Sequence, residues 1–201
     1  MSIKKIITGL TLSMLLASGV ASAADFYKGL EAAQSGDFKT ALAEWTPLAE
    51  QGDAETQHNL GDMYNHGAGI PQNSKTAVKW YTLAAEQGYA SAQFNLGLMY
   101  YKGRGVLGSY RTAASWFTKA AGQGHDKAQG VLGEMYSNGE GVVVNNIKAY
   151  MWVNLAAYNT SKYSKHAGKI RGELAKKMTT AQIGEAQDMS SRCLESNYTD
   201  C

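Results

Sequence analysis

The chain contains few of the residues that metal and redox sites use. Its 201 residues include two cysteines, Cys193 and Cys201, and four histidines. No C-x-x-C pair is present, so the usual dithiol redox motif is missing. No two histidines are four residues apart and none lies near a cysteine, which predicts scattered surface histidines rather than a zinc or catalytic cluster. The sequence therefore predicts no catalytic, cofactor-binding or metal site.

Long hydrophobic runs are also missing, except for one near the start of the chain. Residues 1–23 read MSIKKIITGLTLSMLLASGVASA, in which two lysines precede an apolar run from Ile6 to Leu16 and a small-x-small end. This run is too short to span a bilayer, which takes roughly 20 apolar residues. It predicts a secretory signal peptide cleaved between Ala23 and Ala24, and an uncleaved anchor is the alternative. We expect no transmembrane span after cleavage.

The exported chain lacks net charge. Loss of Lys4 and Lys5 reduces the 19 basic residues to 17, equal to the 17 acidic residues. A nucleic-acid-binding domain is strongly basic, so no nucleic-acid partner is expected. The charges are uneven, however: residues 24–65 are mostly acidic, and residues 162–177 are mostly basic. This gradient either orients a partner or reflects solvated helix faces.

Export bears on the two cysteines, which both lie near the end of the chain. Disulfides form and persist in oxidising compartments outside the cytosol. A disulfide between Cys193 and Cys201 would tie down the tail of the chain, and two free thiols are the alternative.

The middle of the chain repeats itself three times without a gap. The segments 54–89, 90–125 and 126–161 share residues at many matching positions, such as Trp80/Trp116/Trp152. Each contains two stretches with apolar residues at helical spacing, separated by a glycine-containing loop. A single helical hairpin cannot bury its apolar face, so such a period predicts a stacked solenoid.

Two recurring features predict helix ends and helix contacts. A capping residue, whose side chain accepts a free backbone N–H, precedes the second stretch of each unit: Asn73, Ser109 and Asn145. A glycine recurs inside each first stretch: Gly61, Gly97 and Gly133. Because a glycine inside a helix costs about 1 kcal/mol relative to alanine, we expect close approach of the partner helix there.

These repeats resemble the Sel1-like repeat family, which is related to tetratricopeptide repeats. The family pattern A-x-A-Q-x-x-L-G-x-M-Y-x-x-G-x-G-V is matched by ASAQFNLGLMYYKGRGV, and the later part by WFTKAAGQG. The resemblance implies an all-α fold, a right-handed α/α solenoid of helical hairpins. It extends less closely to a diverged unit at 24–53, where GDFKTALAEWTPLAEQG supplies a second helix.

The array is expected to stop after residue 161, because the third unit ends in AYNTS where the others have Gln-Gly. Residues 162–201 are expected to form C-terminal capping helices and a tail. The second of these helices starts with a capping box, Thr179-x-x-Gln182. Such helices would cover the open end of the solenoid.

One stretch, GRGVLG at residues 103–108, spells the dinucleotide-binding pattern G-x-G-x-x-G. The equivalent stretches of the other units are GAGIPQ and GEGVVV, which keep the first two glycines and lack the third. A pyrophosphate site needs the third glycine, whereas a hairpin loop needs only glycines that tolerate positive φ after a helix end. We therefore expect Gly103 and Gly105 to be loop residues and Gly108 to be incidental.

A candidate binding surface lies on the first helix of the central unit. In tetratricopeptide relatives the first helix of each hairpin lines a concave groove, and the resemblance implies the same here. Phe94, Leu98 and Tyr101 share one side of this helix, away from its core stripe. They form either a binding hot spot or contacts with neighbouring helices. Asn59 and Asn95 match positions where relatives often place an asparagine that holds a peptide backbone, and the third unit departs from this with Val131.

The resemblance implies an exported, non-enzymatic protein–protein interaction adaptor, periplasmic or secreted, that binds a peptide or partner protein on its concave face. The alternative is a structural subunit of a periplasmic envelope assembly, such as a flagellar motor or secretion machinery. A remote alternative is a weak β-lactam hydrolase. The relatives described in that way carry a cysteine pair in each repeat, whereas this chain has one pair at its end.

Overall fold

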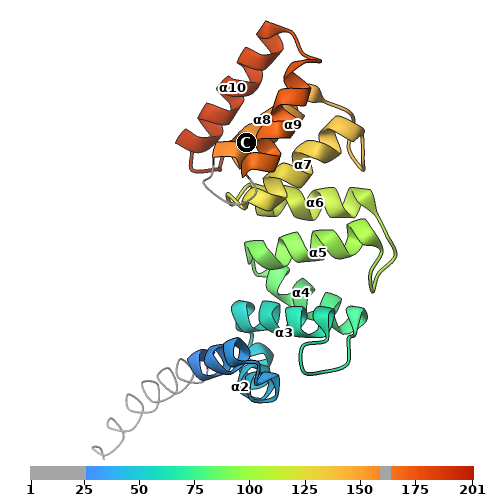
Figure 1. The fold of residues 1–201 in the computed structure, drawn as a ribbon, viewed down its shortest axis with the longest axis vertical. Helices are drawn as coiled ribbons and strands as arrows, with labels where there is room; N and C mark the ends of the chain where they lie inside the picture. Colours follow the sequence, from blue (N-terminus) through green and yellow to red (C-terminus); the bar gives the residue numbers. More distant parts are fainter. Residues whose placement is uncertain (1–25, 159–163) are drawn as a thin grey trace, which may run out of the picture.

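The structure is an array of α-helical hairpins stacked in chain order (Figure 1). It is a computed structural model that describes residues 26–158 and 164–201. Residues 26–35 are helical. They are followed by α2 (Phe38–Glu50), α3 (Ala54–His66), α4 (Ser74–Glu86), α5 (Ala90–Lys102), α6 (Tyr110–Ala121), α7 (Asp126–Asn138), α8 (Asn146–Tyr158), α9 (Ser164–Ala175) and α10 (Thr180–Glu195). The all-α solenoid expected from the sequence is confirmed.

Two of the sequence predictions concern residues outside the described part of the chain. These are the signal peptide at residues 1–23 and the end of the repeat array at residue 161. Over residues 26–158 and 164–201, no helix has both the length and the apolar character that crossing a membrane requires.

The recurring helical glycines lie where the two helices of a hairpin touch. A Cβ atom at Gly97 would lie 2.6 Å from Cε1 of Phe117 on α6. The corresponding distances are 2.5 Å from Gly61 to Tyr81 and 2.6 Å from Gly133 to Val153. Real Cβ atoms essentially never come this close to other heavy atoms. Glycine therefore lets a buried side chain of the second helix lie directly against the first helix, as the sequence predicts.

The loop between the two helices of a unit uses its two glycines differently. Gly103 ends α5 with φ 63°, in the left-handed region, and its N–H bonds back to the last turn of the helix. Gly105 has φ 72°, and a Cβ atom there would overlap the carbonyl group of Ser74 at the start of α4. Gly108 has neither feature. The loop of one unit therefore packs on the second helix of the unit before it, and the G-x-G-x-x-G spelling reflects this joint.

Glutamine side chains join consecutive units through the interior. Gln57, Gln93 and Gln129 each donate a side-chain N–H to the carbonyl of the alanine eight residues earlier, at 2.9, 3.1 and 3.2 Å. Gln87 and Gln123 donate in turn to Oε1 of Gln57 and Gln93, both at 2.8 Å. Among the described residues, Oε1 of buried Gln129 has no hydrogen-bond partner. The register places Asn159, which lies outside the described residues, at the position of Gln87 and Gln123.

The caps expected from the sequence are formed. Asn73, Ser109 and Asn145 each accept the backbone N–H three residues ahead, at 3.1, 3.2 and 2.9 Å. At the start of α10, Thr179 and Gln182 make both hydrogen bonds of the capping box.

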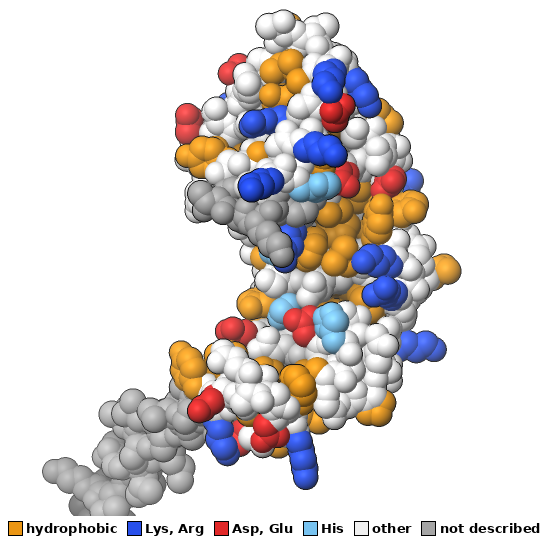
Figure 2. All heavy atoms as spheres, in the orientation of Figure 1, with side chains coloured by type: hydrophobic (Ala, Val, Ile, Leu, Met, Phe, Trp, Pro, Cys, Tyr) orange, Lys and Arg blue, Asp and Glu red, His pale blue; other side chains and the backbone are white. Residues whose placement is uncertain are grey.

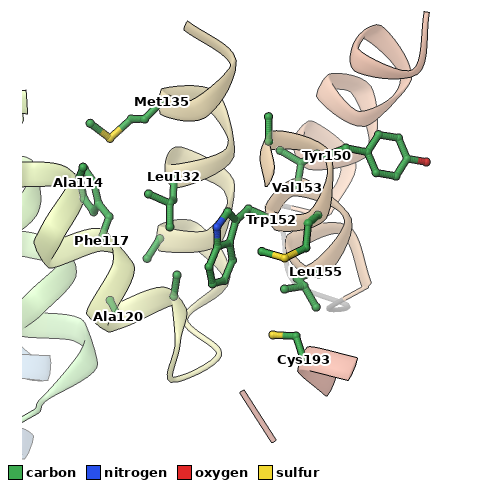
Figure 3. Packing of buried hydrophobic residues seen from close by; sticks show 14 of the residues in the cluster. Ala114, Phe117, Ala120, Leu132, Met135, Tyr150, Trp152, Val153, Leu155 and Cys193 are labelled. Carbon is green, nitrogen blue, oxygen red and sulfur yellow. The ribbon is translucent and has the colours of Figure 1, made fainter. Parts of the chain in front are cut away.

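The last helices enclose α8. Both α9 and α10 pack on α8, which also packs on α7. Side chains around the whole circumference of α8 are therefore buried, including Tyr150, Trp152 and Leu155 (Figure 3). A helix that is apolar on every side must be covered on every side. The two C-terminal helices cover α8 in this way.

A disulfide joins Cys193 on α10 to Cys201 at the end of the chain, with 4.8 Å between the Cα atoms. Cys193 is fully buried, and the tail that it holds places the ring of Tyr198 against Gly124, in the turn between α6 and α7. The disulfide thus fastens the tail to the turn between α6 and α7.

We expect Gly97→Ala to lower the free energy of unfolding by about 1–3 kcal/mol, because the added methyl overlaps the buried ring of Phe117. Gly168→Ala is the matched control, because Gly168 lies in α9 with no heavy atom within 4 Å of an added Cβ. That substitution should raise the free energy of unfolding by about 0.5–1 kcal/mol. Urea unfolding followed by circular dichroism measures both. Equal effects of the two substitutions would show that glycine is not needed for the hairpin contact.

Candidate functional site

The first helices of the three units, α3, α5 and α7, form one surface, which we call the first-helix face. Hydrogen bonds and ring contacts join these helices directly, between α3 and α5 and between α5 and the start of α7. Figure 2 shows hydrophobic side chains gathered over the middle of the array, with histidine and acidic side chains above and below them. The face therefore has an apolar centre and polar flanks.

The apolar centre contains the three residues predicted from the helical wheel. Phe94, Leu98 and Tyr101 on α5 are each half-buried and pack against the core cluster formed by α6–α10. The ring of Phe94 lies 5.7 Å from that of Phe117. The ring of Tyr101 lies 5.0 Å from that of Tyr110. The structure thus brings the three side chains together, with one part of each in contact with neighbouring helices and another part exposed.

One flank is a hydrogen-bonded network that spans α3, α4 and α5. Asn95 donates its side-chain N–H to Oδ1 of Asp62 and to Nε2 of His58, both at 3.1 Å. Tyr81 donates its hydroxyl to the same Asp62 oxygen at 2.5 Å. Burial and the negative charge of Asp62 raise the pKa of Tyr81 far above its ordinary value, so the hydroxyl keeps its proton. The network holds the first and second units in register.

Asn59 and Asn95, the two asparagines at the position that holds a peptide backbone in relatives, differ in their surroundings. Asn95 is committed to the network with Asp62 and His58. The structure records no hydrogen bond from the side chain of Asn59 to another described residue, and this side chain is half-exposed. Val131, at the same position of the third unit, packs against the core. The three units therefore do not present a uniform row of polar groups.

The other flank joins the centre to the third unit. Tyr101 donates its hydroxyl to Oε2 of Glu140 at 2.7 Å, across from α5 to the loop after α7. This hydrogen bond, with burial, raises the pKa of Tyr101 to about 12. The Tyr101 side chain is therefore fixed at its tip as well as along its ring.

The prediction of scattered surface histidines is wrong for His58 and His125, which are half-buried. The ring of His58 lies 5.2 Å from that of Tyr89, and the ring of His125 lies 4.7 Å from that of Phe94. In the 36-residue register, His58 occupies the same position as Phe94, and Tyr89 the same position as His125, so histidine and aromatic residue change places between the two pairs. This exchange is the signal in the sequence that could have found the two ring contacts. In the described part of the chain, no group of histidine, cysteine and acidic residues is placed to hold a metal ion.

Comparison with known proteins matches the Sel1 repeat to residues 54–89, 90–125 and 126–161, the same three segments that the internal register defines. The chain belongs to the Sel1 repeat family. Sel1 repeat solenoids are typical protein-interaction scaffolds. The comparison with curated proteins finds no match.

Two solved structures are similar to this Sel1 repeat protein. One is a Sel1 repeat protein from Oxalobacter formigenes, 30% identical, with 84% of this chain and 75% of that chain covered and a TM-score of 0.67. The other is a protective antigen present in uropathogenic Escherichia coli strains, displaying an SLR fold. It is also 30% identical, with 88% and 46% covered and a TM-score of 0.54. The chain thus spans less than half of that antigen's length.

We expect Asn95→Ala to lower the free energy of unfolding by about 1–3 kcal/mol, because it removes the shared donor of Asp62 and His58 at the joint of two Sel1 units. The matched control is Asn59→Ala, at the same position of the first unit. This substitution should change the free energy of unfolding by no more than about 0.5 kcal/mol. Urea unfolding compares the two variants. A control variant as unstable as Asn95→Ala would rule out the network as the cause.

Proposed function

We propose that this Sel1 repeat protein is an exported adaptor that binds a peptide or a partner protein on its first-helix face. The observation that carries the proposal is the half-exposed cluster of Phe94, Leu98 and Tyr101 at the centre of this face. Binding hot spots are enriched in aromatic side chains, lie near the middle of an interface and are bordered by polar groups. The cluster has all three properties.

The contacts of the cluster favour binding because they fix its shape beforehand. Phe94 packs between Phe117 and His125, and Tyr101 is held by Tyr110 and Glu140. Side chains that are already ordered lose little conformational entropy when a partner covers them. A rigid aromatic cluster therefore contributes more to affinity than the same side chains on a mobile loop.

Two features support export. The N-terminal sequence has the order of a secretory signal, with basic residues, an apolar run and a small-x-small end. The disulfide between Cys193 and Cys201 is typical of an oxidising compartment. A single cysteine pair at the tail gives no support to the β-lactam hydrolase alternative.

A photoreactive amino acid placed at position 98 should crosslink the partner in intact cells, because Leu98 lies within the proposed contact. The matched control position is Leu83 on α4, a second helix, where the side chain is 46% exposed. Mass spectrometry of the crosslinked product names the partner. Equal crosslinking from both positions would contradict the site, and a stoichiometric complex that persists through purification would favour a structural subunit.

The purified partner then allows the affinity to be measured. Changing Phe94, Leu98 and Tyr101 together to serine should weaken binding at least about 30-fold, the effect of losing a hot spot of roughly 2 kcal/mol. The control carries Leu83→Ser and Leu107→Ser, which remove exposed apolar side chains outside the first-helix face. Circular dichroism checks that each variant is folded. If the triple variant is unfolded, the single substitution Leu98→Ser replaces it in the affinity measurement. Unchanged affinity in a folded variant would exclude this surface.

A further inference from the structure

The first helices of the three units begin with different residues at the same position: Asp53, Tyr89 and His125. Asp53 caps α3 by accepting the N–H of Thr56 at 2.7 Å. Tyr89 makes no side-chain cap for α5. His125 caps α7 through its ring, because Nδ1 accepts the N–H of Ala128 at 3.2 Å. Of these three helices, only α7 has a cap that changes its charge near neutral pH.

The same ring contacts the apolar centre of the first-helix face. His125 stacks on Phe94, with the ring centroids 4.7 Å apart and the planes inclined by 25°. One half-buried side chain therefore joins the start of α7 to the proposed binding surface.

Protonation would remove the cap for two reasons. Nδ1 of a protonated imidazole carries a hydrogen and cannot accept another N–H. The positive charge would also lie at the positive end of the α7 dipole, where cations are unfavourable. The cap is therefore formed only while His125 is neutral.

Burial is the main influence on the titration of His125, and it lowers the pKa of the ring below its ordinary value of 6.5. On α7 itself, Asp126 raises this pKa and Lys127 lowers it, and His58 on α3 lowers it as well. The ring of Phe94 on α5, on which His125 stacks, carries no charge. At neutral pH His125 is thus uncharged, and its cap is complete.

We infer that His125 is an acid-sensitive latch, which frees the start of α7 from its cap when the pH falls, loosens the support beside Phe94 and thereby weakens partner binding on the first-helix face. This inference rests on the proposed function. A proton from solvent binds Nδ1, the hydrogen bond from Ala128 is lost, and no covalent bond between heavy atoms changes. The folded protein binds this proton less readily than the unfolded chain does. The cap therefore contributes fully above pH 6.5, and its contribution is lost as the pH falls through the lowered pKa.

Amide hydrogen exchange of the full chain tests the latch without a partner. Between pH 7.5 and 5.0, the protection factor of the Ala128 amide should fall about five-fold, the usual effect of losing a side-chain cap. In His125→Asn, which keeps an acceptor that does not titrate, it should stay high at both pH values. In His125→Tyr, which copies the uncapped start of α5, it should be low at both. The Ala92 amide of α5 is the internal control and should not change.

Crosslinking from the photoreactive residue at position 98 tests the link to binding. Its yield in cells should fall about five-fold at an external pH of 5.0 in the wild-type chain and stay constant in the His125→Asn background. Constant protection of Ala128 in the wild-type chain would overturn the latch. A fall in protection with a constant crosslinking yield would overturn the regulation and leave the proposed function intact. Absence of crosslinks at both pH values would instead overturn the proposed function.

Discussion

The contact between a glycine of the first helix and a buried side chain of the second helix is the constraint on which the array depends. At Gly97 the ring of Phe117 lies where a side chain would otherwise stand. The two helix axes can therefore approach closely, and the buried ring fills the space between them. Gly61 repeats this contact with the ring of Tyr81, and Gly133 makes it with Val153, where backbone atoms of α8 also come close. With the hairpins held together in this way, the interior glutamines of successive units bond to the equivalent backbone carbonyl.

This constraint also determines which side chains reach the surface of the central unit. Phe117 occupies the space over Gly97, and the rings of Phe94 and Tyr101, one turn away on either side, lie 5.7 and 6.5 Å from its ring. His125, which caps α7, contacts Phe94, and Glu140, in the loop after α7, accepts the hydroxyl hydrogen of Tyr101. The apolar centre of the first-helix face is therefore an extension of the core that neighbouring units cover only in part.

The 36-residue register predicts most of the fold, because it reports contacts that every unit repeats. The caps at Asn73 and Thr179 and the close approach at Gly97 follow from residue type and position alone. The register could not predict the hydrogen bonds of Asn95, because its partners His58 and Asp62 lie 37 and 33 residues away on another helix. Whether such side chains meet depends on the rise and twist from unit to unit, which emerge only when all the contacts are combined. For the same reason the sequence could place Phe94, Leu98 and Tyr101 on one face but could not decide how far neighbouring helices cover them.

Positions outside the repeated contacts differ between units, and the N-cap residues of the first helices are an example. Asp53 makes a cap through its carboxyl group, Tyr89 makes none, and His125 makes one that depends on its protonation state. The backbone conformation at all three is extended, so each residue is accommodated without a change of the fold. The chemistry therefore differs between units while their geometry does not. A titratable residue at this position affects the apolar centre only in the third unit, because only there does the capping ring also stack on Phe94.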